Sequence, residues 1–212
     1  MDFFEWIELI SRRLENPLPG KDAHILMAPQ PVDLKRFEDK FRENHRKSGV
    51  LLLFYPEDGN VIFPLIKRPE YPGVHSGQIA LPGGKMEPED LNLIQTALRE
   101  AEEEIGVKKD SVQILGQMTD LYIPTSNFLV SPVVGFLPEK PKLVPDQYEV
   151  SRIIPTNLSS LQDETIRRKT KLKLSNGFVL DTPYFEIDGE MVWGATAMIL
   201  SELAFLLSME EG

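Results

Sequence analysis

A glycine turn leading into a helix with three closely spaced carboxylates constrains this chain more than any other feature. The turn is Gly83-Gly84, and residues 99–107 read Arg-Glu-Ala-Glu-Glu-Glu-Ile-Gly-Val. With about 3.6 residues per turn, Glu100, Glu103 and Glu104 share one stripe, because residues three and four apart are helix neighbours. Carboxylates that close repel each other unless a cation lies among them, and Mg²⁺ suits carboxylate oxygens and also holds phosphates. The segment therefore predicts a metal–phosphate site.

The helix around these carboxylates also has a side that faces the core. At about 100° per residue, Glu100 and Glu104 lie along one margin of an apolar arc, with Glu103 slightly further round. The arc itself is formed by Leu93, Ile94, Ala97, Leu98, Ala101 and Ile105.

An acidic helix alone has a simpler interpretation as a solvated face. Arg99 and Glu103 then form an ordinary i,i+4 ion pair, worth roughly 0.2–0.5 kcal/mol. The glycine turn and the spacing of the whole string favour the metal site over this alternative. Gly106 predicts the C-terminal end of the helix, and Glu89 or Asp90 suits its start.

The string resembles the signature of the Nudix hydrolase superfamily, which reads Gly, five residues, Glu, seven residues and then the Arg-Glu string. Residues 99–107 match its second half throughout. In the first half, the family's Glu position counted from Gly84 is Asp90 here, and eight residues separate Asp90 from Arg99. The resemblance implies an α/β (α+β) fold, an α/β/α sandwich with a mixed β-sheet. It also implies cleavage of a nucleoside diphosphate linked to another group, by metal-activated water.

The resemblance further implies roles for the matching residues. Glu100, Glu103 and Glu104 bind or orient a divalent metal, Mg²⁺ or Mn²⁺, with Glu104 as a direct ligand and Glu103 also among the catalytic groups. Arg99 holds the carboxylates in place by an ion pair and is counted with the catalytic residues. The Gly83-Gly84 turn lets the backbone pass close to the site and contact the substrate.

The overall charge supports a metal-dependent reaction. The chain has a net charge of −10 at pH 7, so its overall field does not attract a polyphosphate. A bound metal polarises a phosphoryl oxygen and lowers the pKa of water, and phosphoryl transfer chiefly needs alignment and charge neutralisation. The sequence has no cysteine and no evident Ser-His-Asp constellation, so we expect direct attack of water on phosphorus.

Further segments resemble the coenzyme A pyrophosphatase branch of the superfamily. They are residues 65–68, 75–84, 96–101 and 192–197, and the whole likeness covers residues 48–207. This branch implies hydrolysis of coenzyme A or acyl-coenzyme A to 3′,5′-ADP and a 4′-phosphopantetheine product.

Two departures leave the substrate open. Gly73 stands where the branch has an arginine suited to a phosphate of coenzyme A, and Leu81 replaces the branch phenylalanine. ADP-ribose or a modified nucleotide is therefore the alternative substrate. A non-catalytic nucleotide-binding sensor is a third possibility, which the complete set of three glutamates disfavours.

Five other residues are candidates with simpler alternatives. Glu149 completes the metal site or acts as the general base, or it is a surface carboxylate. Arg68 at a strand end contacts a phosphate or is an exposed charge. His75 and Gln78 are candidate substrate contacts, although a lone histidine is more often structural. Trp193 is a core or hinge residue rather than a stacking platform.

Length and composition predict one domain with an extension. We place a helical extension at residues 1–47, packed on a Nudix domain at residues 48–212. The lack of cysteine fits a reducing cytoplasm, and the acidic balance argues against nucleic acid as a partner. No signal peptide or membrane-spanning run is expected, so the expected partner is a small nucleoside diphosphate derivative. The N-terminal helix covers the domain or joins a second subunit in a homodimer.

Periodicity and turn signals predict the remaining elements. Helices are expected at residues 2–15, near 33–46 and about 195–209. Strands are expected near residues 48–55, 60–68, 112–122 and 127–137. Turns are expected at residues 56–60, Asn176-Gly177 and Asp188-Gly189. The first helix carries on one side Phe3, Phe4, Ile7, Ile10 and Leu14.

Overall fold

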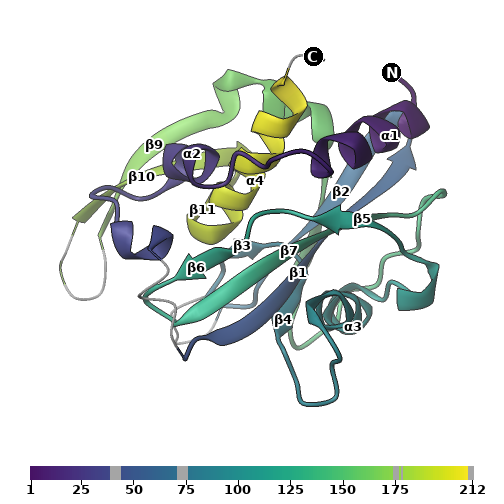
Figure 1. Cartoon of the computed structure of the whole chain (residues 1–212), viewed down its shortest axis with the longest axis horizontal. Coiled ribbons are helices and arrows are strands. Elements are labelled where there is room, and N and C mark those ends of the chain that lie inside the picture. Colours follow the sequence, from purple (N-terminus) through teal and green to yellow (C-terminus); the bar gives the residue numbers. More distant parts are fainter. Residues whose placement is uncertain (39–43, 71–75, 174–176, 178, 210–212) are drawn as a thin grey trace.

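The chain forms a mixed sheet between two layers, in a computed structural model that describes residues 1–38, 44–70, 76–173, 177 and 179–209. In Figure 1, α3 lies on one side of the sheet, and α1, α2, α4 and a smaller sheet lie on the other. The predicted α/β/α sandwich is confirmed. The helices are α1 (Phe3–Leu14), α2 (Lys21–His24), α3 (Leu93–Ile105) and α4 (Gly194–Ser208). Short 3-10 turns span Ile25–Met27, Leu34–Phe37, Lys109–Ser111, Leu158–Gln162 and Glu164–Ile166.

The larger sheet is mixed because β1 pairs in parallel with β7 and antiparallel with β2 and β4. Its strands are β1 (Arg46–Glu57), β2 (Asn60–Lys67), β3 (Ile79–Ala80), β4 (Gly83–Lys85), β5 (Gln113–Gln117), β6 (Leu121–Ile123), β7 (Phe128–Phe136) and β8 (Arg152–Asn157). The main path runs β3-β2-β1-β7-β5, while β4, β6 and β8 pair with β1, β7 and β2. The predicted turn between β1 and β2 is confirmed, with positive φ at Asp58 and Gly59.

The apolar run of β1 builds two cores back to back. Side chains alternate across a strand, so Leu51 and Leu53 belong to the core beneath α3, together with Ala97 and Ala101. Leu52 and Phe54 belong to the core on the opposite face, which includes Ile7 and Ile10 of α1 and the buried apolar residues of α4. The side chains on one face of the central strand β1 therefore form the surface on which α3 packs.

The ends of α3 correct one prediction and confirm another. The helix begins after Asn92, whose side chain accepts a hydrogen bond from the Gln95 amide at 2.9 Å, so the predicted start at Glu89 or Asp90 is wrong. The reason is that the Asp90 carboxylate is buried and engaged elsewhere. Gly106 ends the helix in the left-handed conformation, with φ of 72°, as predicted.

The N-terminal segment is only partly as predicted. Helix α1 is confirmed and begins with a capping box between Asp2 and Glu5. Its buried side is wrong in one place, because Phe4 is 59% exposed and Leu9 is buried instead. The helix predicted near residues 33–46 is wrong where the structure describes it: only a 3-10 turn, Leu34–Phe37, forms before β1. The Asp33 side chain accepts a hydrogen bond from the Lys35 amide at the start of this turn, and Glu38 takes an extended conformation that ends it.

The strand predicted near residues 112–122 is two strands. It is interrupted after Gln117, because Met118 turns into the core and the Thr119 amide and hydroxyl donate to Glu202 of α4. The strand resumes as β6, which pairs with β7. Tertiary contacts with α4 therefore override the local strand pattern.

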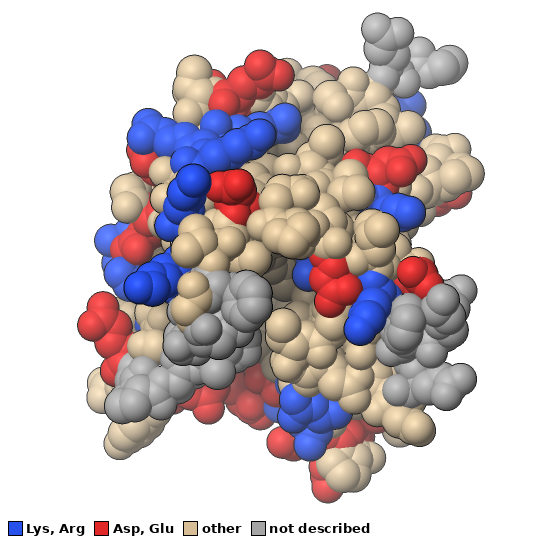
Figure 2. Space-filling view, turned by 90° about the vertical axis from the view of Figure 1, so that its left-hand side faces the viewer, with Lys and Arg blue, Asp and Glu red and all other residues tan. Residues whose placement is uncertain are grey.

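A second, antiparallel sheet of order β11-β10-β9 lies beside α4. It comprises β9 (Arg167–Lys173), β10 (Val179–Ile187) and β11 (Glu190–Trp193). The Asp188-Gly189 hairpin is confirmed, whereas Asn176 of the other predicted hairpin lies outside the described residues. Trp193 is half-buried at the N-cap of α4. Figure 2, which views the molecule from the left-hand side of Figure 1, shows Lys and Arg side chains gathered at the upper left of that face. Helices α1 to α4 include none long and apolar enough to cross a membrane.

Candidate metal and diphosphate site

Strand β4 brings the glycine turn directly against α3. A Cβ atom on Gly84 would lie 2.4 Å from Cδ of Glu100, so any side chain at this position would displace the Glu100 carboxylate. Gly84 also pairs with Gly49 of β1. A Cβ atom on Gly49 would lie 2.4 Å from the Leu93 carbonyl oxygen of α3. Helix α3 therefore packs directly against the backbone of these two glycines, and its carboxylates reach the glycine turn that precedes it.

Glu104 is the buried member of the carboxylate stripe. Its side chain is 1% exposed, and Oε2 accepts a hydrogen bond from the Gly83 amide at 2.7 Å. Oε1 lies 3.6 Å from Nη2 of Arg68. The pKa of Glu104 is raised to about 7, chiefly by burial and to a smaller extent by the negative charges of Glu100 and Glu149, against the opposing effects of the Gly83 amide and Arg68. This carboxylate therefore lacks full charge compensation within the protein.

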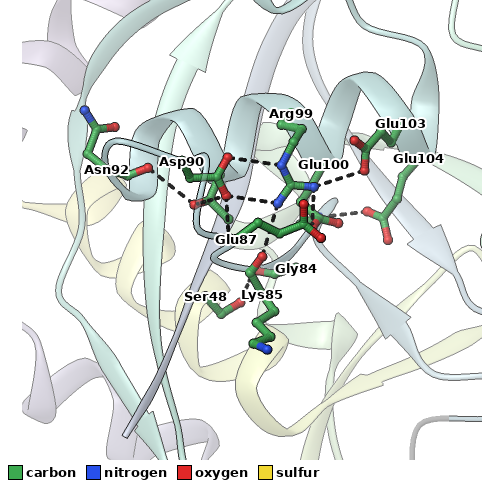
Figure 3. Close-up of polar contacts among 12 residues, drawn as sticks. Ser48, Gly84, Lys85, Glu87, Asp90, Asn92, Arg99, Glu100, Glu103 and Glu104 are labelled. Atoms are coloured by element: carbon green, nitrogen blue, oxygen red, sulfur yellow. Dashed lines mark hydrogen bonds and ion pairs between the residues drawn. The ribbon is translucent and has the colours of Figure 1, made fainter.

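Arg99 connects the first half of the motif with the second. In Figure 3 its guanidinium lies between Asp90 on one side and Glu100 and Glu103 on the other. Nη1 lies 2.9 Å from Oε1 of Glu100 and 3.1 Å from Oε2 of Glu103. Nη2 donates to the Lys85 carbonyl at 3.1 Å. The guanidinium thus orders the carboxylates and also fastens the helix to the glycine turn.

Asp90 anchors this arginine from a buried position. Hydrogen bonding to Arg99 lowers the pKa of Asp90 to about 2, assisted by hydrogen bonds from the Glu87 amide and the Thr96 hydroxyl. The sequence pattern left the role of Asp90 open, since the residue stands one position away from the usual spacing. Its contacts make it a structural partner of Arg99 at the edge of the site.

The three glutamates of the stripe differ in exposure. Glu104 is buried, the side chain of Glu100 is 14% exposed, and that of Glu103 is 56% exposed. Burial raises the pKa of Glu100, an effect opposed by Arg99 and increased by Glu103 and Glu149. The stripe therefore runs from the interior, at Glu104, to the solvent rim, at Glu103.

Glu149 approaches the stripe from a distant part of the sequence. It lies on the loop before β8, and its charge acts on both Glu100 and Glu104. Gln78 is partly buried near the turn, and its carbonyl accepts from the Arg68 amide at 3.0 Å. His75 and Gly73 lie outside the described residues. The structure thus brings Arg68, Gly83, Glu104 and Glu149 to one place, and leaves Trp193 at the start of α4.

The donor set fits a hard divalent cation. Carboxylate oxygens are the ligands that Mg²⁺ and Mn²⁺ prefer. The pKa values of Glu100 and Glu104 are raised mainly by burial and to a smaller extent by neighbouring carboxylates, and an added cation would stabilise the charged form of both side chains. Within the described part of the chain, no three acidic or histidine side chains are already placed to hold a metal ion. Mg²⁺ usually keeps several waters and is bound by one or two carboxylates together with substrate phosphates.

Fold and site together define a hydrolase built as an α/β/α sandwich with a carboxylate-bearing helix. The chain belongs to the Nudix hydrolase family: the NUDIX domain pattern matches residues 45–152. Members of this family generally use divalent metal ions such as Mg²⁺ or Mn²⁺.

Two relatives extend the similarity over most of the chain. A protein named uncharacterized Nudix hydrolase NudL, from Yersinia enterocolitica serotype O:8 / biotype 1B, is 34% identical over 84% of this chain and 87% of its own length. The NudL protein of Photorhabdus laumondii subsp. laumondii is 34% identical over 84% of this chain and 91% of its own. Among solved structures, the MutT protein from Methanosarcina mazei Go1 superposes with a TM-score of 0.48 and 18% identity, over 78% of this chain and 96% of that one.

Proposed function

We propose that this Nudix hydrolase is a divalent-metal-dependent diphosphatase whose substrate is coenzyme A or an acyl-coenzyme A. The observation that carries the reaction class is the buried Glu104 carboxylate, which lies against the Gly83 amide and within reach of the charges of Glu100 and Glu149. A buried acid with further carboxylates around it is costly unless a cation joins them. The same cation would offset the repulsion between an acidic protein and an anionic diphosphate.

Each residue of the site has a proposed task. Glu100 and Glu104 hold Mg²⁺ or Mn²⁺ from the inner part of the stripe, and Glu103 completes or orients this shell from the rim. When bound, the metal neutralises phosphate charge and lowers the pKa of its bound water. Arg99 keeps Glu100 and Glu103 in position through its contacts at 2.9 and 3.1 Å.

Glu149 is the proposed general base. It is exposed, so solvent water reaches it. In this role Glu149 accepts the proton of the attacking water, and the water oxygen displaces a phosphate oxygen at phosphorus. Arg68 lies 3.6 Å from Glu104 at the end of β2, where its guanidinium can pair with a phosphate of the substrate. The Gly83-Gly84 backbone lies alongside, and His75 and Gln78 are proposed contacts from the segment that precedes it.

The coenzyme A assignment rests on two segments that resemble that branch of the family. Residues 75–84 and 192–197 lie far apart in sequence, yet the Thr196 hydroxyl donates to the Ile79 carbonyl at 3.2 Å. Two branch-like segments thus come together beside the glycine turn, which supports a shared role in binding one substrate. Gly73, in place of the branch arginine, favours ADP-ribose or a modified nucleotide as the second candidate.

A substrate panel with identified products tests this proposal. Coenzyme A, acetyl-coenzyme A and ADP-ribose are incubated with Mg²⁺ or Mn²⁺, and we expect 3′,5′-ADP from the first two. Glu104→Gln should abolish turnover. Glu102→Gln is the matched control on the same helix, because Glu102 points away to Lys109. Preference for ADP-ribose would replace the substrate assignment, and metal-dependent binding without turnover would identify a sensor.

A further inference from the structure

The loop that carries Glu149 is fastened to the C-terminal end of α3. The Val144 amide donates to the Ile105 carbonyl at 2.9 Å, and the Asp146 amide donates to the Glu104 carbonyl at 2.9 Å. The last carbonyl groups of a helix have no partners within it, so the loop supplies donors that the helix lacks. Loop and helix end are therefore one unit, although about 40 residues separate them.

Gly106 makes this close fastening possible. It adopts the left-handed conformation with φ of 72°, and a Cβ atom there would lie 3.3 Å from Cβ and from the carbonyl oxygen of Val144. The chain can therefore leave the helix while the loop passes against its last turn.

The Asp146 carboxylate serves the loop rather than the helix. Its Oδ1 accepts hydrogen bonds from the Tyr148 amide at 2.8 Å and from the Glu149 amide at 3.0 Å. The Asp146 carbonyl accepts from the Val150 amide at 3.0 Å, which closes the turn around Glu149. A carboxylate near a helix C-terminus is electrostatically unfavourable, because that end carries partial negative charge. The benefit of Asp146 therefore lies in the turn that it holds.

We propose that Asp146 is the residue that positions Glu149 against the metal-binding carboxylates. The path is short and made of hydrogen bonds: the Glu104 carbonyl holds the Asp146 amide, and the Asp146 carboxylate holds the Glu149 amide. The same residue, Glu104, thus contributes its side chain to the site and its backbone to the support of the base. This inference rests on the proposed function, in which Glu149 accepts the proton of the attacking water.

Removal of the Asp146 acceptor tests the inference. In Asp146→Ala, kcat for the substrate that the wild type hydrolyses should fall by about tenfold to a hundredfold, since a displacement of about 1 Å can cost that much. KM and the Mg²⁺ concentration for half-saturation should change by less than about twofold, because general-base catalysis and metal binding are separate contributions. Asp146→Asn keeps an oxygen at the Oδ1 position and should retain most of the activity. Asp163→Ala is the matched control, because Asp163 caps the Thr165 amide in the same way at 2.8 Å in a different part of the fold.

A double-mutant cycle separates positioning from general destabilisation. In a Glu149→Gln background, Asp146→Ala should lower kcat by less than about twofold further, because coupled residues are not additive. Fully additive losses would overturn the inference.

Hydrogen exchange provides a readout that needs no turnover. The Tyr148 and Glu149 amides of the metal-free protein should lose protection in Asp146→Ala and keep it in Asp146→Asn. Unchanged protection in Asp146→Ala would refute the positioning role. Absence of any turnover by the wild type would instead refute the proposed function, while the exchange data would still decide whether Asp146 holds Glu149.

Discussion

Two nitrogen atoms of Arg99 donate to the two carboxylate oxygens of Asp90, Nε to Oδ1 at 3.1 Å and Nη2 to Oδ2 at 3.0 Å. This paired geometry is the strongest form of the arginine–carboxylate contact. It leaves Nη1 for Glu100 and Glu103, so one guanidinium joins the buried turn residue to the carboxylate stripe.

Asp90 should stabilise the fold at neutral pH and lose this effect in acid. Its pKa is about 2 in the folded protein and 3.8 as a reference, so the stabilisation is fully present above about pH 4 and is lost as pH falls through about 2. Asp90→Asn should therefore lower the free energy of unfolding by about 2 kcal/mol at pH 6 and by much less at pH 2. Urea unfolding across this range measures the difference, with the exposed Asp110→Asn as control. An equal loss at both pH values would contradict the prediction.

Glu104 should have the opposite pH dependence in the metal-free protein. Its pKa is raised to about 7, so the protonated form stabilises the fold fully below about pH 4.5, and this stabilisation is lost as pH rises through about 7. Relative to Glu104→Gln, the wild type should lose up to about 3 kcal/mol between these pH values. Unfolding in the presence of a chelator measures the loss, and added Mg²⁺ should restore stability above pH 7. Glu103→Gln, at the exposed rim, should leave the slope unchanged.

Gly84→Ala should weaken metal binding without unfolding the protein. The added Cβ would lie 2.4 Å from Cδ and Oε2 of Glu100, so this carboxylate must move away from the stripe. We expect a loss of at least about tenfold in Mn²⁺ affinity, since support of a ligand is typically worth tenfold to a hundredfold. Electron paramagnetic resonance of free Mn²⁺ reports the affinity. Gly116→Ala is the control, because its Cβ would meet Leu14 at an ordinary 3.4 Å, and equal affinities in the two variants would reject the explanation.

Glu202 should be a major determinant of stability outside the site. It is fully buried in α4 and accepts hydrogen bonds from the Gly20 amide at 2.9 Å and from the Thr119 amide at 3.2 Å. It also lies 3.1 Å from Nε2 of the buried His24. Glu202→Ala would orphan these groups, and we expect a loss of about 3–5 kcal/mol. The urea midpoint measures the loss, and the exposed Glu8→Ala should leave it unchanged. A small effect for Glu202→Ala would mean that water replaces the carboxylate.

Elements whose signals are local could be predicted from the sequence. Helix α3 follows from its apolar spacing and from Gly106, and the β1–β2 hairpin follows from the turn residues Asp58 and Gly59. In both cases neighbouring residues determine the backbone. The stripe of carboxylates was equally visible, because helical geometry alone places residues 100, 103 and 104 together.

Features that depend on distant partners could not be predicted. Glu202 is a single charged residue in an otherwise uncharged helix. Its structural role is evident only from its contacts with Gly20, His24 and Thr119, which lie far away in the sequence. From the sequence, Asp146 is an ordinary acidic loop residue, and only the structure shows that its amide donates to the Glu104 carbonyl. The charged segment near residue 34 was misread as a helix, because its apolar spacing does not reveal that the chain becomes extended at Glu38 after one short 3-10 turn.

The paired glycines beneath α3 limit how this protein can change. Gly49 and Gly84 are neighbours across β1 and β4, and each would clash with α3 if it gained even a methyl group. A mutation at either glycine would therefore lift the helix or displace Glu100, whichever residue replaced it. Side chains on the outer face of α3 are free to vary. The distance between the helix and the sheet cannot change by a small amount, because even a methyl group at these glycines is too large. Successive single substitutions can alter the residues around the site, but they cannot change the depth at which its carboxylates lie above the sheet.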